Sequence, residues 1–248
     1  MIPWKQSSPG NDLQEGEVHL WRVGLDVSDP ALCALRRMLS EDEVQRSKRY
    51  RFPVLQRRFA AGRGALRAIL AGYLSMESDR LKFGYTAHGK PFLLDSAAIQ
   101  FNLSHSGGLM VAAFCRNWPI GVDIEREDRR LDPVEIAERY FCDREKEEIA
   151  RADTSLRHRV FFQLWTAKEA VLKATSIGLA LELSKLEVAL APLRVVTLEN
   201  EAKAHGASWH LAGFRPDEDY SGTLAVAGRP SRLEYYDFLP PSNHQASS

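Results

Sequence analysis

Apolar and polar residues follow two different periods along the chain, which predicts a mixture of strands and helices. Alternation or short apolar runs predict strands at 17–27, 81–85, 99–103, 108–115 and 120–125. A period near 3.6 predicts helices at 41–52, 54–74, 133–140, 143–151 and 155–175. After residue 180 the pattern again favours strands, at 185–191, 193–198, 208–214 and 222–228.

The helices gather in two places, and strands flank each group. This order favours an α+β fold over a doubly wound parallel sheet, and it is compatible with two similar halves. Local signals support the boundaries: Ser40 and Glu43 form a capping-box pattern, and Pro53 ends the helix that this box begins. Pro133 opens the next helical region, and Asp143 is expected to cap its second helix.

Composition narrows the class of protein only slightly. Of 248 residues, 44% are hydrophobic and 27% are charged, which is typical of a globular chain. The start of the sequence lacks a signal-peptide core, and no apolar run approaches a membrane span. Three cysteines without a CxxC pair indicate reduced thiols and a cytoplasmic protein. The polar end of the chain, 239–248, is expected to be a disordered tail.

Charge is balanced overall but uneven along the chain. Thirty-three Lys and Arg face thirty-three Asp and Glu, so net charge gives no support for nucleic-acid or membrane binding. Residues 46–67 hold eight bases and no acid, whereas 123–148 hold eleven acids and six bases. Such patches suit an anionic ligand bound beside a metal ion, although two solvated helix faces of opposite sign would give the same pattern.

The strand IGVDIE, 120–125, carries two acids on one face. Alternation directs Val122 and Ile124 to one side and Asp123 and Glu125 to the other. Neighbouring carboxylates repel each other, and desolvating either of them is costly. The pair therefore indicates either a solvated strand end or a bound cation.

A third acid lies on the last long helix, in FFQLWTAKEAVLKA. Glu169 and Lys173 are four residues apart and share one helical face. In isolation the pair would be read as a surface ion pair, but its flanks are strongly apolar, so this face is expected to line a cavity. Three carboxylates with phosphate and water could complete an octahedral shell around Mg²⁺.

Three further segments carry groups that suit phosphate. FNLSHS places Ser104 and His105 where a strand ends, although a His in a turn is more often merely hydrogen-bonded. GKP places Lys90 in a turn, where a lysine taken alone would be read as solvated. Guanidinium groups bind phosphates bidentately, and the basic helix has four of them. These are Arg57, Arg58, Arg63 and Arg67. Neither a Walker loop nor a GxGxxG pattern is present, so side chains would have to hold any nucleotide.

Taken in order, GKP, FNLSHS, GVDIE, RYFCDRE and LWTAKEAVLKA resemble the Sfp-type 4′-phosphopantetheinyl transferases. The resemblance implies a monomer of two similar α+β halves, 1–117 and 118–238, with the active site in the cleft between them. It also implies the reaction: transfer of the phosphopantetheine arm of coenzyme A to a serine of an apo acyl or peptidyl carrier protein, with Mg²⁺, releasing adenosine 3′,5′-bisphosphate.

The matching motif positions imply a role for each site residue. Asp123, Glu125 and Glu169 would bind magnesium, and Glu169 would also be the candidate base toward the carrier serine. Lys173 would neutralise the α-phosphate or protonate the leaving group. The other contacts would be made by Ser104 and His105 to the phosphates, by Lys90 near the nucleotide and diphosphate, and by Arg58 and Arg46 at the 3′-phosphate. Glu43 departs from the family, whose members often have a base there.

Two other classes of function remain open from the sequence. A magnesium-dependent nucleotide phosphohydrolase could use the same acids, but it would need a water-activating base or a second metal, and no further His/Asp cluster is visible. A non-catalytic module that binds coenzyme A or a carrier protein would be expected to lack Glu169 or Lys173, and both are present.

Overall fold

The structure is a computed structural model that describes residues 2–10, 12–96, 98–128, 130–175, 183–198 and 209–240. Its strands are β1 (Lys5–Ser7), β2 (Glu17–Gly24), β3 (Phe83–Tyr85), β4 (Pro91–Leu93), β5 (Ile99–Ser106), β6 (Leu109–Arg116), β7 (Ile120–Arg126), β8 (Leu186–Leu190), β9 (Leu193–Leu198), β10 (His210–Phe214), β11 (Tyr220–Val226) and β12 (Arg232–Phe238). Its helices are α1 (Asp29–Arg36), α2 (Glu41–Lys48), α3 (Pro53–Leu74), α4 (Pro133–Tyr140), α5 (Asp143–Arg151) and α6 (Arg157–Thr175), with 3₁₀ turns η1 (Ser78–Arg80) and η3 (Leu183–Lys185).

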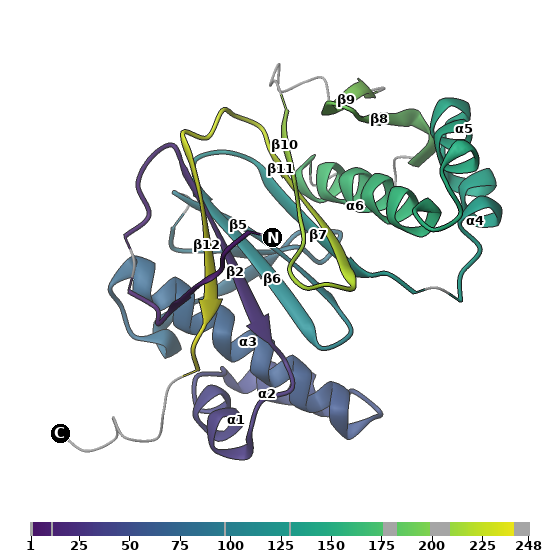
Figure 1. The fold of residues 1–248 in the computed structure, drawn as a ribbon. Coiled ribbons are helices and arrows are strands. Elements are labelled where there is room, and N and C mark those ends of the chain that lie inside the picture. Colours follow the sequence, from purple (N-terminus) through teal and green to yellow (C-terminus); the bar gives the residue numbers. More distant parts are fainter. Residues whose placement is uncertain are drawn as a thin grey trace.

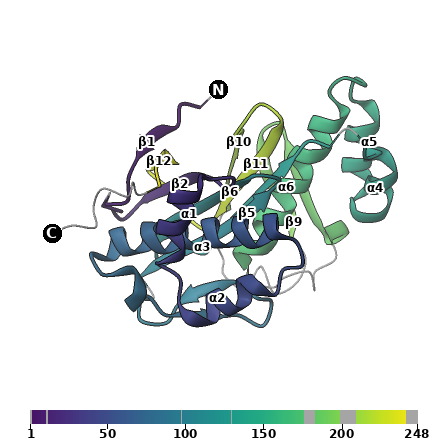
Figure 2. The same ribbon diagram turned by 90° about the horizontal axis from the view of Figure 1, so that it is seen from below.

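The same succession of elements occurs twice. A strand, three helices, a small hairpin and two more strands run from β2 to β6, and again from β7 to β11. The pairing repeats as well, because β2–β6–β5 and β7–β11–β10 are both antiparallel with the last strand of each half in the middle. The predicted α+β fold of two similar halves is therefore confirmed, and the two helix groups lie on opposite sides of the molecule (Figures 1 and 2).

The chain ends extend the first sheet. β12 pairs in parallel with β2, and β1 pairs in parallel with β12, giving the order β1–β12–β2–β6–β5. A strand that follows the second half in sequence thus completes the sheet of the first. The division at residue 117 remains a proposal, and residues 241–248 of the expected tail lie outside the described residues.

Three apolar clusters stabilise this arrangement. One joins α1 and α3 to the five-stranded sheet, and a second joins α4, α5 and α6 to β8, β10 and β11. The third lies between the two sheets and so holds the halves together. Its strand members include Val18, Leu20, Val111, Ala113, Ile120, Val122, Ile124, Leu224 and Val226. The apolar face of β7 predicted from alternation is part of this third cluster.

Local signals explain most helix starts. The Ser40 backbone N–H donates to Glu43 Oε2 over 3.1 Å, which confirms the capping-box start of α2. Asp132 caps α4 by accepting from the Val134 backbone N–H. The expectation that Asp143 caps α5 is wrong: Cys142 occupies the cap, its N–H donates to a side chain of the first turn, and Asp143 is the first helical residue.

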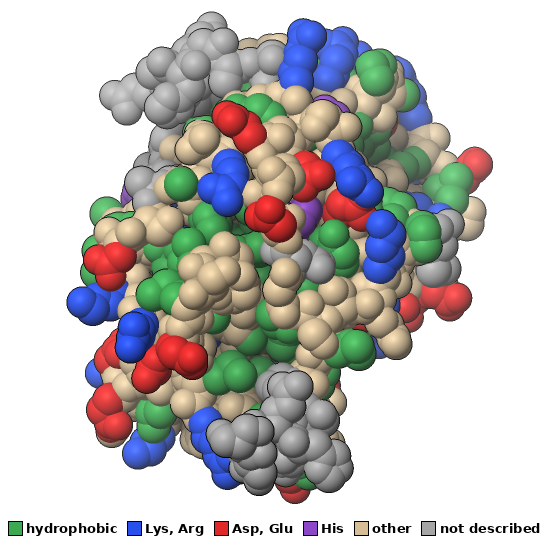
Figure 3. All heavy atoms as spheres, turned by 90° about the vertical axis from the view of Figure 1, so that its left-hand side faces the viewer, with side chains coloured by type: hydrophobic (Ala, Val, Ile, Leu, Met, Phe, Trp, Pro, Cys, Tyr) green, Lys and Arg blue, Asp and Glu red, His purple; other side chains and the backbone are tan. Residues whose placement is uncertain are grey.

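Surface properties agree with the balanced composition. On the face shown in Figure 3, basic and acidic side chains are interspersed rather than gathered into separate fields. No helix in the described ranges is both long enough and apolar enough to cross a membrane.

Candidate active site

The two sheets meet at β5 and β7, and this junction brings two of the sequence motifs together. Ser104 Oγ donates to Asp123 Oδ1 over 2.8 Å, and Ser106 Oγ donates to Glu125 Oε2 over 2.8 Å. The Val122 backbone N–H donates to Asn102 Oδ1 over 2.9 Å. Because both strands have a period of two, each hydroxyl of FNLSHS lies opposite one acid of GVDIE.

Helix α6 brings the third acid and a cation to the same place. Lys173 Nζ lies 2.6 Å from Asp123 Oδ1 and donates to Ser104 Oγ over 3.0 Å. Glu169, one turn earlier, lines the same cavity of about 730 Å³. The structure thus gathers the groups that the sequence singled out on β5, β7 and α6.

Burial changes the protonation chemistry of these acids. The pKa of Glu169 is raised, first by burial and then by the charge of Asp123, while Lys173 acts in the opposite direction. The pKa of Glu125 is also raised by burial, although its hydrogen bond from Ser106 opposes the effect. A cation beside these carboxyl groups would lower the pKa of both and favour their ionised forms.

The donor set fits a hard divalent cation. Asp123 is 3% exposed, and its Oδ2 is buried without a hydrogen-bond partner among the described residues. An unsatisfied buried carboxylate oxygen beside two other acids is the arrangement that a bound cation would relieve. Among the described residues, no group of three or more Asp, Glu, His or Cys side chains is already arranged so that it could hold a metal ion. Magnesium commonly binds one or two carboxylates and takes its other ligands from water and phosphate.

His105 lies on the opposite face of β5 from Ser104. Its side chain is exposed and lines both the acid-bearing cavity and a neighbouring cavity of about 230 Å³. Gly89, Pro91 and Leu103 also line both. The two cavities are therefore adjacent sections of one cleft, and His105 stands where they meet.

The smaller cavity has aromatic walls and a basic rim. The Arg46 guanidinium lies 5.3 Å from the centre of the Tyr85 ring and 5.8 Å from that of Phe59, and no described acid pairs with it. Arg58 is more constrained, because it makes two hydrogen bonds of 2.7 Å to Asp26 and a third to the Gly107 carbonyl. The same contact lowers the pKa of the Asp26 carboxyl.

Glu43, the departure from the family pattern, does not face this cavity as a free acid. It is 1% exposed, and its Oε2 accepts from Arg67 over 2.6 Å. Arg63 Nε lies 3.5 Å from its other oxygen. Two guanidinium groups of α3 therefore neutralise this carboxylate beneath the cavity.

Comparisons with known proteins agree with the geometry. Residues 26–117 match the model "4′-phosphopantetheinyl transferase, N-terminal", and residues 119–225 match "4′-phosphopantetheinyl transferase superfamily". The chain is 40% identical over 228 residues to the 4′-phosphopantetheinyl transferase HetI of Nostoc sp., covering 91% of this chain and 94% of that relative. The chain belongs to the 4′-phosphopantetheinyl transferase family.

A second relative supports this membership at greater distance. The 4′-phosphopantetheinyl transferase psf-1 of Bacillus pumilus is 30% identical over 210 residues, covering 84% of this chain and 87% of that relative. The expectation of a transferase drawn from the succession of motifs is confirmed.

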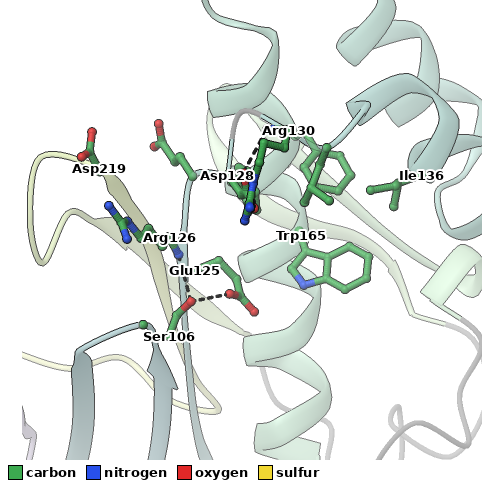
Figure 4. A pocket seen from close by; sticks show the side chains of 13 residues that line it. Ser106, Glu125, Arg126, Asp128, Arg130, Ile136, Trp165 and Asp219 are labelled. Atoms are coloured by element: carbon green, nitrogen blue, oxygen red, sulfur yellow. Dashed lines mark hydrogen bonds and ion pairs between the residues drawn. The ribbon is translucent and has the colours of Figure 1, made fainter. Parts of the chain in front are cut away.

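In this transferase a third cavity, of about 750 Å³, opens on the other side of Glu125. Figure 4 shows Glu125 and Trp165 pointing into it and Arg126 and Arg130 at its rim. Phe161 and Phe162 contribute apolar surface. Glu125 and Trp165 also line the cavity of about 730 Å³ that holds the acids, which we call the central cavity. The third cavity therefore adjoins the acids.

Sequence reasoning missed several residues of the site. Trp165, one of the apolar flanking residues of Glu169, is half-buried and lines two cavities. Ser106 could have been found, because it lies two residues beyond Ser104 on the same strand face. Lys168, which lies outside these cavities, gives no such signal, because the groups that hold its buried ammonium, Glu145 and two backbone carbonyls, belong to other elements.

The position of Lys90 also differs from that of an exposed turn lysine. Its ammonium donates to the carbonyls of Ile120 and Lys173, over 3.0 and 2.8 Å. Burial lowers its pKa to about 8. Lys90 therefore lines the cavity that holds the acids, while its ammonium group donates to backbone carbonyls.

Proposed function

We propose that this transferase moves 4′-phosphopantetheine from coenzyme A to a serine hydroxyl of an apo acyl or peptidyl carrier protein, with Mg²⁺, and releases adenosine 3′,5′-bisphosphate. The observation that carries the proposal is the divided environment of Asp123. One of its oxygens contacts Lys173, while the other is buried beside two further acids and has no partner in the described ranges.

The acids are assigned to the metal. Asp123, Glu125 and Glu169 would hold Mg²⁺, which when bound would neutralise charge on the diphosphate. Phosphoryl transfer requires mainly positioning and charge neutralisation from the protein. Ser104 and Ser106 orient the two acids of β7 by donating to them.

Lys173 is assigned to the α-phosphate or to protonation of the leaving group. Its contact with Asp123 keeps the ammonium at the edge of the central cavity. Ser104 and His105 are assigned to the phosphates. Ser104 also donates to Asp123 and accepts from Lys173, so its hydroxyl contacts both the acid and the ammonium.

Arg46 and Arg58 are assigned to the 3′-phosphate, at the far end of the cleft. The aromatic walls of the smaller cavity suit an adenine base, and its basic rim suits a phosphate. Lys90 remains assigned to the wall beside the nucleotide and diphosphate, where its neighbours Gly89 and Pro91 line both cavities.

Glu169 is also the candidate base toward the carrier serine, acting directly or through water. Its pKa is raised by burial, and its carboxylate makes no hydrogen bond or ion pair to another described residue. A carboxylate with a raised pKa accepts a proton more readily at neutral pH. The ligand role and the base role compete, since a metal-bound carboxylate is a weaker base.

The carrier protein is expected to approach from the open side of the cleft. Exposed apolar residues at the start of α3 lie among arginines and suit an acidic, partly apolar partner. These are Phe52, Val54 and Leu55, beside Arg51 and Arg57.

We further expect a cytoplasmic monomer that binds neither nucleic acid nor membrane, with its three cysteines reduced.

Intact-mass measurement tests the proposal. Apo acyl and peptidyl carrier proteins are incubated with the enzyme, coenzyme A and Mg²⁺, alongside the Asp123→Ala variant. A gain of one phosphopantetheine group that the variant does not produce is the expected result. Hydrolysis of coenzyme A without modification of any carrier would instead indicate a phosphohydrolase.

A further inference from the structure

Lys90 crosses from one half of the molecule to the other. It follows the Thr86–Gly89 turn between β3 and β4, and its backbone N–H donates to Thr86 Oγ1 over 3.1 Å. Its ammonium nevertheless donates to the carbonyls of Ile120, on β7, and Lys173, on α6. No described carboxylate pairs with this ammonium, so backbone oxygens alone receive its hydrogen bonds.

These two carbonyls belong to the elements that carry the site. Lys173 lies in the last described turn of α6, where the helix dipole favours a cation. Ile120 begins β7, three residues before Asp123. One ammonium therefore links the end of α6 to the start of β7.

The link lies beside a close approach of the two elements. A Cβ atom at Gly121 would overlap the Ala170 carbonyl oxygen and the Ala174 amide nitrogen of α6. Only glycine allows the two backbones to touch in this way. A small shift of α6 along β7 would thus change how Glu169 and Lys173 face Asp123.

We propose that Lys90 is a positioning residue whose ammonium holds α6 on β7, so that Glu169 and Lys173 stay in register with Asp123. The first half of the chain then completes a metal site whose acids all come from the second half. This inference rests on the proposed magnesium role of the three acids. It assigns Lys90 an action through the backbone, in addition to its place on the cavity wall.

Metal binding without coenzyme A tests the proposal, because substrate phosphate is then absent. The Kd for Mn²⁺, a spectroscopic substitute for Mg²⁺, is measured by electron paramagnetic resonance for the wild type and for Lys90→Met. Removing a positive charge near three carboxylates would by itself tighten metal binding. Lost positioning would weaken it, and loss of such a supporting contact typically costs about tenfold or more in metal affinity.

We therefore expect the Kd of Lys90→Met for Mn²⁺ to rise about tenfold. Lys90→Arg, whose guanidinium can donate to both carbonyls, is expected to restore most of the affinity. Lys82→Met is the matched control, because this exposed lysine precedes β3 in the same hairpin and lines none of the cavities. It should leave the Kd unchanged. Because a partly unfolded protein would show a raised apparent Kd, each Kd is measured at a temperature at which circular dichroism shows that the variant is fully folded.

Unchanged or tighter Mn²⁺ binding by Lys90→Met would overturn the positioning role. If the KM for coenzyme A then rose, the ammonium would be a direct phosphate ligand instead.

Failure of the proposed function has a different signature: the wild type itself would bind no Mn²⁺ or would modify no carrier. If Lys90→Met does not fold, Lys90→Gln, which keeps one donor, is expected to show a smaller rise in Kd, and an unchanged Kd in that variant would overturn the proposal equally.

Discussion

Lys173 Nζ lies 2.6 Å from Oδ1 of Asp123, while Oδ2 of the same carboxylate is buried and accepts no hydrogen bond from the part of the chain that the structure describes. The two oxygens therefore have separate roles in the proposed site. One holds the ammonium at the cavity edge, and the other is free to bind a cation. A single acid would couple the metal to the group that acts on the phosphate.

Asp123→Asn should remove the contribution of Asp123 to the metal site without unfolding the protein. The amide keeps the shape of the side chain but removes the charge, so carrier modification is expected to fall by about 10³-fold, as expected when several kcal/mol of metal stabilisation is lost. The apo protein should remain folded, because one of three repelling acids is gone. Thermal unfolding with and without Mg²⁺ provides the check: the rise in Tm with Mg²⁺ should disappear.

Asp29→Asn is the control for that experiment. Its carboxylate is exposed and pairs with Arg57, away from the cavities, so the same chemical change should affect neither activity nor the response to Mg²⁺. An Asp123→Asn variant that kept the full Mg²⁺ response would remove Asp123 from the metal site.

The raised pKa of Glu169 predicts how stability depends on pH. Between the ordinary value of 4.5 and the raised folded value, the folded protein binds more protons than the unfolded chain. The metal-free protein should therefore lose stability as pH rises through this window. Glu169→Gln should reduce that loss, so its advantage over the wild type should grow with pH and then level off. Urea unfolding in the presence of a chelator measures this.

Magnesium should reverse the trend, because it favours the ionised acids. The increase in Tm caused by Mg²⁺ is expected to grow with pH in the wild type and to be smaller in Glu169→Gln. An identical pH profile in the two proteins would show that Glu169 neither titrates in this range nor contacts the metal.

Sequence patterns predict those parts of this site in which the period of one strand or one helix places suitable side chains on the same face. Alternation placed Asp123 and Glu125 on one face, and helical spacing paired Glu169 with Lys173. Their meeting at the junction of two sheets depends on contacts between distant segments. The succession of motifs supplied that link through the family resemblance.

What the sequence did not reveal depends on long-range packing. β12 joins the sheet by parallel pairing with β2, more than 200 residues earlier, and no local signal marks such a partner. A charged side chain usually indicates a solvated surface. Lys90 and Lys168 break that rule because their ammonium groups reach backbone carbonyls of other elements, which no window along the chain can show.

Arg46 and Arg58 should differ in their effects on cofactor binding. Arg46 has no acidic partner among the described residues, whereas both oxygens of Asp26 already engage Arg58. We expect Arg46→Ala to weaken binding of adenosine 3′,5′-bisphosphate by about tenfold to a hundredfold, which corresponds to one lost charged hydrogen bond. Calorimetric titration should show almost no effect on adenosine 5′-monophosphate, which lacks the 3′-phosphate.

Arg58→Ala provides the comparison. It should weaken binding of the bisphosphate by a smaller factor, because its guanidinium must be shared with Asp26. If both ligands lost affinity equally in Arg46→Ala, the side chain would act by stacking on the base rather than by binding the 3′-phosphate.

The buried pair of Lys168 and Glu145 predicts a large effect on stability. Both side chains are fully buried, 2.5 Å apart, and the ammonium also donates to the Leu183 and Leu186 carbonyls. Lys168→Met would leave Glu145 charged in the interior, which costs about 3–5 kcal/mol. The double variant with Glu145→Gln should recover part of this loss, since no buried charge then remains. The exposed Glu147–Arg151 pair is the control, and Arg151→Met should change stability by less than about 0.5 kcal/mol.

This pair also bears on the active site, because Lys168 immediately precedes Glu169. Its contacts hold α6 to α5 and to the start of β8, which fixes the rotation of the helix that presents Glu169 and Lys173. Lys168→Met should therefore weaken Mn²⁺ binding even under conditions in which the protein remains folded. A variant that lost several kcal/mol of stability but kept the wild-type Kd for Mn²⁺ would show that α6 is oriented by its apolar contacts alone.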